Sequence, residues 1–356
     1  MPPKSTMHEP PDSPLDPAMP LVNLHSHLEG SIRPATYLEL CRAMGLPAPN
    51  SLEEAQALLS VDGSETCLHD YLERITPVGP ILKGVAALER TSYEAAEDAR
   101  RDGVAYFELR AGPLLHLTPT VDTSATIEAM LRGLQEAERA LGIAARLIVC
   151  ALRAHDPLDN EALARVAVRY AGRGVVGFDL AGDEKGYPAR HHARAYAIAA
   201  AGGLGLTCHA GEGEGSASIV EAAESLGARR IGHGTHLDDT PGRVAWAKAE
   251  GLVLEICPTS NVDTRAVPSL ADHPVRRLFD AGLRISIGDD DPTTSRTRIA
   301  RELRLLASTF GFTLPELVQI QRTGLEAAFA EPTATAPIRA QLDAFAARTV
   351  SLSSAS

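Results

Sequence analysis

Two histidines one residue apart, His25 and His27, end an apolar segment near the start of the chain. In an extended strand, residues i and i+2 project from the same face, so both imidazoles would point the same way. Neutral imidazole binds zinc, iron, nickel and copper, so the pair suits a transition metal without specifying which one. Taken alone, such a pair more often caps a strand through hydrogen bonds to backbone and water.

Three later stretches change that interpretation, because each places metal-ligand or acid/base side chains directly after another apolar run. They are His209-Ala-Gly-Glu212, Gly232-His233-Gly234 and Gly288-Asp-Asp-Asp-Pro292. A catalytic metal site needs about three protein ligands and an open position for water. Nitrogen atoms of His25, His27 and His209, with one aspartate oxygen from the last stretch, would supply that set.

Proton transfer requires a further group beside such a metal, because the metal produces hydroxide from its water near neutral pH. Glu212 stands three residues beyond His209, which makes it a neighbouring general acid/base and not a ligand. His233, held between glycines, is placed to orient the hydroxide. We expect His236 in a turn or a supporting position, and His191-His192 in a solvated turn or helix start.

The composition restricts the class of protein and its partners. The 356 residues are 44% hydrophobic and 22% charged, an ordinary globular profile. A net charge of −12 without a basic stripe argues against long nucleic acid and anionic membranes as partners, and no apolar run could span a bilayer. The odd number of scattered cysteines, without CxxC, predicts reduced thiols in a cytoplasmic protein: Cys41, Cys67, Cys150, Cys208 and Cys257.

Short β-rich runs alternate with helical segments along most of the chain. After the strand that ends at His27, the runs are 104–109, 146–151, 175–180, 204–209, 230–233, 252–257 and 284–288. Helical segments include 34–44, 123–141, 160–171, 192–201, 218–226, 243–250 and 273–281. Eight apolar strands alternating with helices predict an α/β fold, a (β/α)8 TIM-type barrel. A doubly wound open sheet is the second interpretation, but no GxGxxG follows the first strand.

The domain prediction is one catalytic barrel over residues 20–348, with extra helices after the first strand. Residues 1–19 are Pro-rich without an apolar signal region and are expected to be a flexible tail, as are residues 349–356. The extra helices form an insertion at about 50–100. One helical face there carries an apolar stripe that either packs in the core or forms a lid over a cleft: Leu68, Tyr71, Leu72 and Ile75.

A barrel places its active site at the C-terminal ends of its strands. The polar outliers fall at these ends, so we expect them at one rim: His25 and His27, Gly182 and Glu184, His209 and Glu212, His233 and His236, and Asp289 to Asp291.

With these residues assembled, the chain resembles the adenosine deaminase family of the amidohydrolase superfamily. The resemblance runs from Leu21 to about Ala330. It rests on ordered motifs: His25-Ser-His-Leu-Glu-Gly30, Asp179-Leu-Ala-Gly-Asp-Glu184, Thr207-Cys-His-Ala-Gly-Glu212, Arg230-Ile-Gly-His-Gly234, Cys257-Pro-Thr-Ser-Asn261 and Asp290-Asp-Pro292.

The resemblance implies one zinc ion per chain, with four protein ligands: His25, His27, His209 and Asp290. It implies that Glu212 carries the proton to purine N1 and that His233 positions the zinc-bound hydroxide. Asp291 would bind purine N7, and the backbone of Gly182 would contact N3. Substrate contacts would come from His27, Glu29, Gly182 and Asp291.

Several departures from the family pattern bear on the substrate. Asp289 stands where the family usually has Thr or Ser, so it either lies beside the metal or points outward. Glu29 follows the two histidines where many adenosine deaminases have a ribose-contacting aspartate, and glutamate there also occurs in relatives acting on free adenine or other aminated purines. Tyr71 and Ile75 stand where many members have phenylalanine. Ala111 and Gly112 replace the usual Phe and Ala, and these smaller residues could enlarge the pocket.

The expected function is zinc-dependent hydrolytic deamination of a small purine substrate, adenosine or 2′-deoxyadenosine first. Adenine or a modified adenine nucleoside is the second interpretation. A catalytically silent purine-binding relative is the third, and the intact set of metal, acid/base and hydroxide-orienting residues argues against it.

Overall fold

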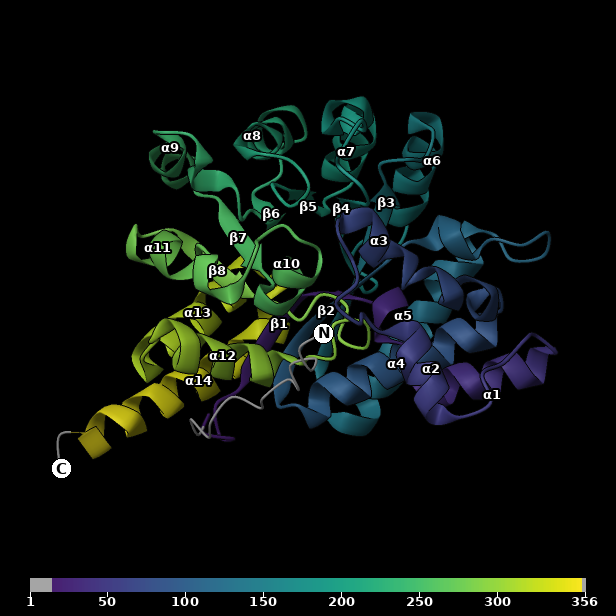
Figure 1. Cartoon of the computed structure of the whole chain (residues 1–356), viewed down its shortest axis with the longest axis horizontal. Helices are drawn as coiled ribbons and strands as arrows, with labels where there is room; N and C mark the ends of the chain where they lie inside the picture. Colours follow the sequence, from purple (N-terminus) through teal and green to yellow (C-terminus); the bar gives the residue numbers. More distant parts are fainter. Residues whose placement is uncertain (1–14, 354–356) are drawn as a thin grey trace, which may run out of the picture.

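The eight predicted strands pair in parallel and in sequence order, as expected for the barrel (Figure 1). The computed structural model describes residues 15–353, with side chains as far as 349; residues 1–14 and 354–356 of the predicted tails lie outside the described part. The strands are β1 (Leu21–His27), β2 (Val104–Ala111), β3 (Ala144–Leu152), β4 (Val175–Ala181), β5 (Gly205–Ala210), β6 (Arg230–His233), β7 (Val253–Ile256) and β8 (Arg284–Ile287).

The sheet closes between its last and first strands through the main chain of the predicted site. Ser26 and Asp290 form an isolated parallel bridge. The N–H of His27 donates to the carbonyl of Asp290 at 2.7 Å, and the N–H of Asp290 donates to the carbonyl of His25 at 2.9 Å. The closure therefore fixes Asp290 beside the two histidines of β1.

Helices surround the strands and form the outer layer of the barrel (Figure 1). They are α5 (Thr123–Leu141), α6 (Pro157–Val168), α7 (Ala193–Ala201), α8 (Ser216–Ser225), α9 (Arg243–Ala249), α11 (Val275–Asp280), α12 (Ile299–Phe310) and α13 (Leu314–Ala327). The short helix α10 (Pro258–Asp263) follows β7 and lies inside this ring, toward the barrel centre (Figure 1). Local signals explain the bounds of α5, because the Asp122 side chain accepts from the N–H of Ala125 and Gly142 ends the helix at φ 66°.

The helical insertion after β1 consists of α1 (Pro34–Met44), α2 (Leu52–Leu59), α3 (Leu68–Glu73) and the 3₁₀ segment η2 (Thr76–Leu82). In Figure 1, α1 and α2 lie at the lower right, whereas α3 lies above them and nearer the strands. The next helix, α4 (Val85–Arg101), packs against β2 and α5. It therefore belongs to the outer layer of the barrel, and the insertion ends before residue 100.

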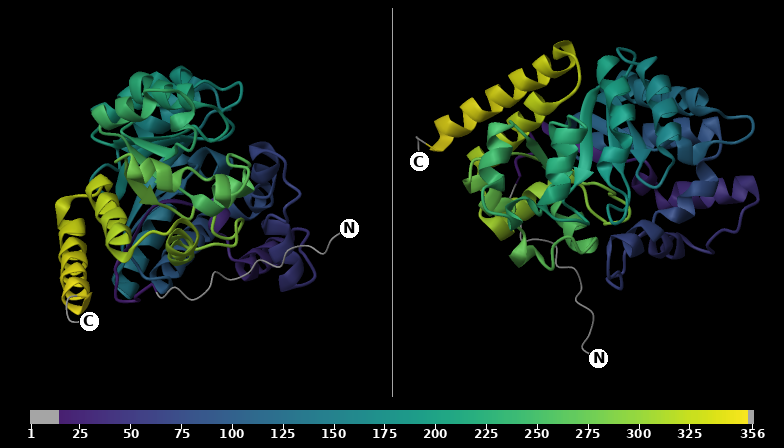
Figure 2. Two further views of the ribbon diagram at one scale, coloured as in Figure 1. Left: turned by 60° about the vertical axis from the view of Figure 1, so that its left-hand side comes forward. Right: turned by 90° about the horizontal axis from the view of Figure 1, so that it is seen from above.

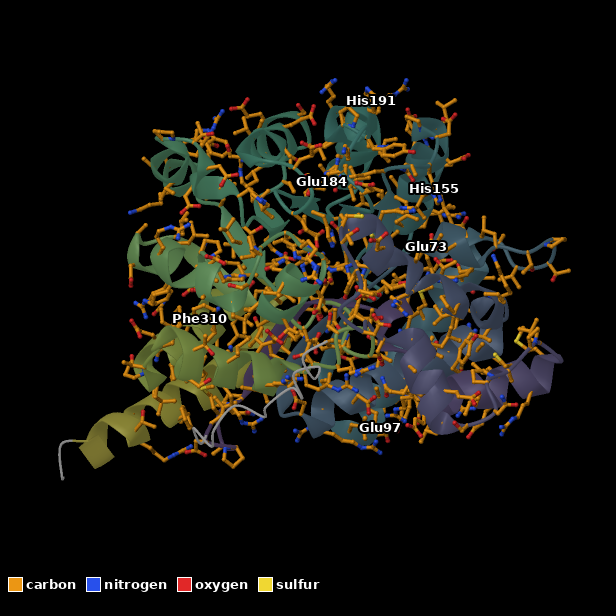
Figure 3. The ribbon with its side chains drawn as sticks, viewed as in Figure 1. Glu73, Glu97, His155, Glu184, His191 and Phe310 are labelled. Atoms are coloured by element: carbon orange, nitrogen blue, oxygen red, sulfur yellow. The ribbon has the colours of Figure 1, made fainter. Side chains whose placement is uncertain are left out.

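Two predicted domain bounds differ from the structure. Met19 is buried, so the packed domain begins before residue 20. The last helix, α14 (Pro332–Ser353), continues past residue 348 and lies along the outside of the barrel (Figure 2). The helix start expected at His191-His192 is confirmed, because His192 is the N-cap residue of α7. Its side chain is buried, where Asn160 donates to its Nδ1 and its Nε2 donates to the carbonyl of Arg153. His191 is exposed at the outer edge, as Figure 3 shows.

The interior of the barrel is polar, although its strands read as apolar runs. Alternate positions on β2 carry Glu108 and Arg110, both fully buried. Arg110 donates to Asp179 at 2.9 Å and to Glu255 at 2.6 Å. Arg230 joins Glu255 at 2.5 Å and Glu108 at 2.6 Å. The two guanidinium groups thus link carboxylates from β2, β4 and β7 into one buried network.

Replacing Arg110 by Met is expected to destabilise the fold by about 3–5 kcal/mol, because two buried carboxylates lose their counter-charge. Urea unfolding followed by circular dichroism measures the change. The matched control is Arg132→Met, whose ion pair with Glu89 is exposed and should contribute less than about 1 kcal/mol. Equal unfolding midpoints for the two variants would contradict the role of the network.

Candidate active site

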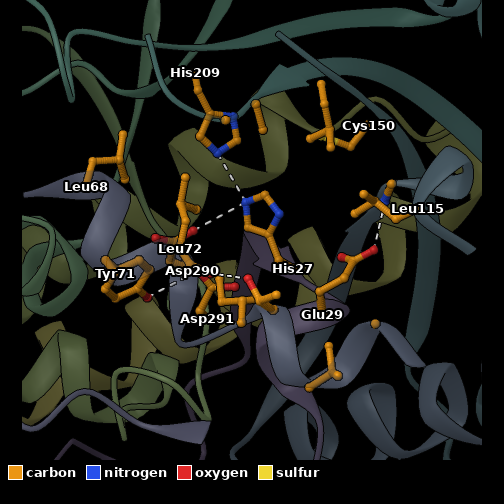
Figure 4. A pocket seen from close by; sticks show the side chains of 18 of the residues that line it. His27, Glu29, Leu68, Tyr71, Leu72, Leu115, Cys150, His209, Asp290 and Asp291 are labelled. Atoms are coloured by element: carbon orange, nitrogen blue, oxygen red, sulfur yellow. Dashed lines mark hydrogen bonds and ion pairs between the residues drawn. The ribbon is translucent and has the colours of Figure 1, made fainter. Parts of the chain in front are cut away.

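Four predicted ligand side chains converge at the C-terminal rim of the barrel, and Figure 4 shows His27, His209 and Asp290 of this group. His25 Nε2 lies 3.2 Å and His27 Nε2 lies 3.4 Å from Asp290 Oδ1. His27 Nε2 lies 3.1 Å from His209 Nε2. All four ligand atoms lie within 4.8 Å of one another. This grouping joins residues from β1, β5 and the segment after β8.

Buried carboxylates hold two of the imidazoles from behind. Glu255 accepts from His25 Nδ1 at 2.9 Å, and Asp179 accepts from His209 Nδ1 at 3.2 Å. A proton on each Nδ1 leaves the Nε2 lone pair facing the centre of the group, as metal-ligating histidines require. His25 Nε2 is buried and has no hydrogen-bond partner among the described residues. This donor set fits a zinc-type ion.

The structure distinguishes the neighbouring aspartates after β8. Asp290 reaches the histidines with Oδ1, while its Oδ2 accepts from Ser260 Oγ at 2.5 Å. Its φ of 59° is left-handed, a conformation that is uncommon outside glycine and concentrates at functional sites. Asp289 points away and accepts from Asn23 Nδ2 at 2.8 Å. The additional carboxylate therefore belongs to the barrel wall and not to the ligand group.

Glu212 lies on the loop after β5, and a second carboxylate holds that loop in place. Glu184 accepts from the backbone N–H groups of Gly211, Glu212 and Gly213 and from Ser218 Oγ. Burial, with the charges of Asp290 and Glu184, raises the pKa of Glu212 well above its usual range. Glu212 is therefore suited to hold a proton near neutral pH.

His233 lies beside Glu212, with 3.4 Å between its Nε2 and Glu212 Oε2. Asn261 Nδ2 is 2.9 Å from His233 Nδ1, so the amide donates there and the ring proton sits on Nε2. Burial lowers the pKa of His233 well below its usual range, which keeps the ring neutral. His236 lies outside this pair and holds the Gly211 carbonyl at 2.9 Å, as expected for a supporting residue.

Sequence reasoning left several supporting residues without a role. Ser260 and Asn261, which contact Asp290 and His233, belong to the motif Cys257-Pro-Thr-Ser-Asn261, which by itself indicates family membership but no role for either residue. The available signal was a helix, α10, beginning directly after β7 at the same rim as the other polar groups. Arg110 and Glu255 were missed because a charged residue inside an apolar strand gives no hint of its partner on another strand.

A cavity of about 380 Å³ opens beside the ligand group (Figure 4). All four side chains of the predicted stripe line it, those of Leu68, Tyr71 and Leu72 from α3 and that of Ile75 from the residue before η2. The apolar lining includes Leu68, Leu72, Ile75, Val78, Leu115 and Leu152. The polar lining includes His27, Glu29, Gly182, His209, Glu212, His233, Asp290 and Asp291, with His116 and Tyr71.

Two further carboxyl groups in the cavity have pKa values that are shifted in opposite directions. Burial and the charge of Asp290 raise the pKa of Asp291 well above its usual range; Tyr71 donates to its Oδ2, and its Oδ1 has no hydrogen-bond partner among the described residues. Glu29 is also buried, but the hydrogen bonds from His116 and the Gly112 N–H lower its pKa. Protonated Asp291 can donate a hydrogen bond to a ligand, whereas ionised Glu29 can only accept one.

This arrangement defines a barrel hydrolase in which an ion-binding group lies beside a neutral acid and a neutral imidazole. Residues 20–345 match the family described as adenosine deaminase, and the chain belongs to this family. It is a hydrolase that acts on a cyclic amidine C–N bond. No described helix is both long and apolar enough to cross a membrane.

The chain is 35% identical to an adenosine deaminase from Enterococcus faecalis, over 88% of this chain and 93% of the relative. A probable adenosine deaminase from Dictyostelium discoideum is 34% identical over 90% of this chain, which spans 42% of that longer protein.

Two solved structures share the fold. A zinc-bound amidohydrolase from Burkholderia ambifaria has a TM-score of 0.86 and 27% identity, covering 96% of this chain and 94% of its own. An adenine deaminase from Arthrobacter aurescens has a TM-score of 0.84 and 25% identity, covering 92% and 99%.

Gly30→Ala is expected to lower kcat/KM about 10- to 100-fold, because an added Cβ would lie 1.8 Å from Asp291 Oδ1 and must displace that side chain. Ammonia release measures the loss. Gly84→Ala is the matched control, since its Cβ meets nothing within 4 Å. Unchanged turnover in the first variant, with normal folding, would show that the position of Asp291 is unimportant.

Proposed function

We propose that the protein hydrolyses the 6-amino group of adenosine or 2′-deoxyadenosine to the corresponding inosine and ammonia. The observation that carries the proposal is the convergence of three imidazole nitrogens and Asp290 beside the Glu212–His233 pair in one cavity. A water-derived oxygen bonds to purine C6, and the bond from C6 to the amino nitrogen breaks.

His25, His27, His209 and Asp290 would hold one zinc ion per chain. The carboxylates behind His25 and His209 support this assignment, as does the zinc in the Burkholderia relative. A bound zinc lowers the pKa of water so that hydroxide is available near neutral pH.

The protein side chains supply the proton transfers and the hold on the ring. Glu212, protonated before the reaction, gives its proton to purine N1; its carboxylate then takes the proton of the oxygen added at C6 and passes it to the departing amine. Neutral His233 donates its Nε2–H to the incoming oxygen. Protonated Asp291 donates to N7, and the backbone of Gly182, at the end of β4, lies against the N3 edge.

The cavity favours an uncharged substrate over a nucleotide. Among the described residues no lysine or arginine lines it, and its charged groups are acidic or histidine. A 5′-phosphate would therefore lack a counter-charge. The five cysteines are free, which supports a reducing, cytoplasmic setting.

Adenine or a modified adenine nucleoside is the second candidate substrate. The observation in its favour is the ionised carboxylate of Glu29, because it accepts a hydrogen bond equally well from a sugar hydroxyl or from the N9–H of a free base. The adenine deaminase from Arthrobacter aurescens shares the fold at 25% identity. Ammonia release from adenosine, 2′-deoxyadenosine, adenine and N6- or 5′-modified adenosines distinguishes these substrates.

Glu212→Gln is expected to reduce kcat by at least about 10²–10⁴-fold, because the amide keeps the shape but cannot transfer a proton. Folding and metal content should stay normal. Glu214→Gln, an exposed change on the same loop, is the matched control. Turnover that survives in Glu212→Gln would remove the assigned role.

Treatment with a chelator is expected to abolish turnover and lower the melting temperature, since the ion binds the folded chain preferentially. Adding zinc should restore both properties, and elemental analysis should find about one zinc per chain. Full activity in metal-free protein would contradict the proposed chemistry.

A further inference from the structure

The wall that holds Glu29 contains a buried histidine that the proposed reaction does not use. In Figure 4, Glu29 lies on the other side of His27 from Asp290, with a dashed contact toward the segment of Leu115. That contact is the 2.8 Å hydrogen bond between Glu29 Oε1 and His116 Nε2. His116 ends the 3₁₀ segment η3 (Pro113–His116), which follows β2.

We propose that His116 is a positioning residue that fixes the Glu29 carboxylate and thereby determines how tightly the site holds the hydrogen-bond donor on the N9 side of the purine. This inference rests on the proposed function, because it assigns a specificity role within the same cavity. The donor is a sugar hydroxyl in a nucleoside or the N9–H in a free base.

The two oxygens of Glu29 have unequal surroundings. Oε1 accepts from both His116 Nε2 and the Gly112 N–H, which lies at 3.0 Å. No other side chain of the described residues donates to this carboxylate in a recorded hydrogen bond. The other oxygen lies on the side of Glu29 that faces His27 in Figure 4, and Glu29 is one of the residues that line the cavity. Glu29 Oε1 thus accepts hydrogen bonds from the protein, and Oε2 remains available to accept one from a ligand.

Among the described residues, the His116 side chain makes a single hydrogen bond, the one to Glu29. It is 0% exposed, and its Nδ1 has no hydrogen-bond partner among the described residues. Its segment is held by Pro113 at the first helical position and by Lys83 Nζ, which donates to the Leu115 carbonyl at 2.6 Å. The imidazole therefore cannot follow the carboxylate if Glu29 turns, and it favours one rotamer of Glu29 over the others.

Loss of His116 should therefore weaken substrate binding selectively. His116 does not belong to the ligand group or the Glu212–His233 pair, so its loss should leave the bond-breaking step nearly intact. Glu29 would lose a charge-assisted hydrogen bond, and its second oxygen would no longer be fixed toward the substrate. Such bonds correspond to an effect of about 10-fold or more on affinity.

The test compares His116→Phe, which keeps a ring but removes the donor, with His116→Gln, whose amide can still donate. We expect His116→Phe to raise KM for adenosine about 10-fold with kcat changed less than about 3-fold, and His116→Gln to restore most of the loss. Calorimetric binding of inosine should weaken in parallel. His191→Phe, at an exposed position within η4 (Ala189–His192), is the control.

A double-mutant cycle shows whether His116 acts through Glu29. In a Glu29→Leu background, His116→Phe should have no further effect on KM or inosine binding. An undiminished effect there would overturn the proposal, as would a loss of kcat at constant KM. If His116→Phe does not fold, Gln is compared with Asn at this position, because the shorter Asn cannot reach Glu29; equal KM values for these two would also overturn it.

The outcomes separate this inference from the proposed function. Wild-type protein that neither deaminates nor binds any purine in the panel would refute the proposed function. Wild-type protein that deaminates adenosine, alongside a His116→Phe variant indistinguishable from it in KM and inosine affinity, would refute only the role of His116.

Discussion

The structure depends on the buried guanidinium group of Arg110, which joins two carboxylates inside the barrel. Arg110 bridges Asp179 and Glu255, and these same carboxylates hold the outer nitrogens of His209 and His25. Without the guanidinium, two negative charges would lie close together in a water-free interior. The interaction that stabilises the barrel is therefore also the one that orients half of the ion-binding group.

The charge around the site is divided so that neighbouring acids differ in protonation. Hydrogen bonding from His25 and the histidine charges hold the pKa of Asp290 well below its usual range despite burial, whereas burial raises those of Asp291 and Glu212. Separating the proton affinities of adjacent groups in this way assigns them acid and base roles. Local backbone strain contributes to the arrangement, since His233 at φ 63° and Asp290 both adopt left-handed conformations.

The sequence predicts the parts of this site that follow from strand periodicity and strand ends. The barrel, most element bounds and the grouping of His25, His27, His209 and Asp290 could be anticipated, because parallel strands bring their C-terminal ends to one rim. The contacts of Arg110 with Asp179 and Glu255 could not, because they join side chains on three strands far apart in the chain. The burial of His192 was missed for the same reason: its partner Asn160 lies on another helix.

Glu184 links two properties of Glu212 that are usually adjusted separately. Its oxygens anchor the backbone on either side of that residue, and its negative charge helps keep the neighbouring proton in place. A substitution that neutralised Glu184 would shift the location and the acidity of Glu212 at once. Redesigning this loop for a reaction at another pH would therefore require a new anchor as well as a new charge.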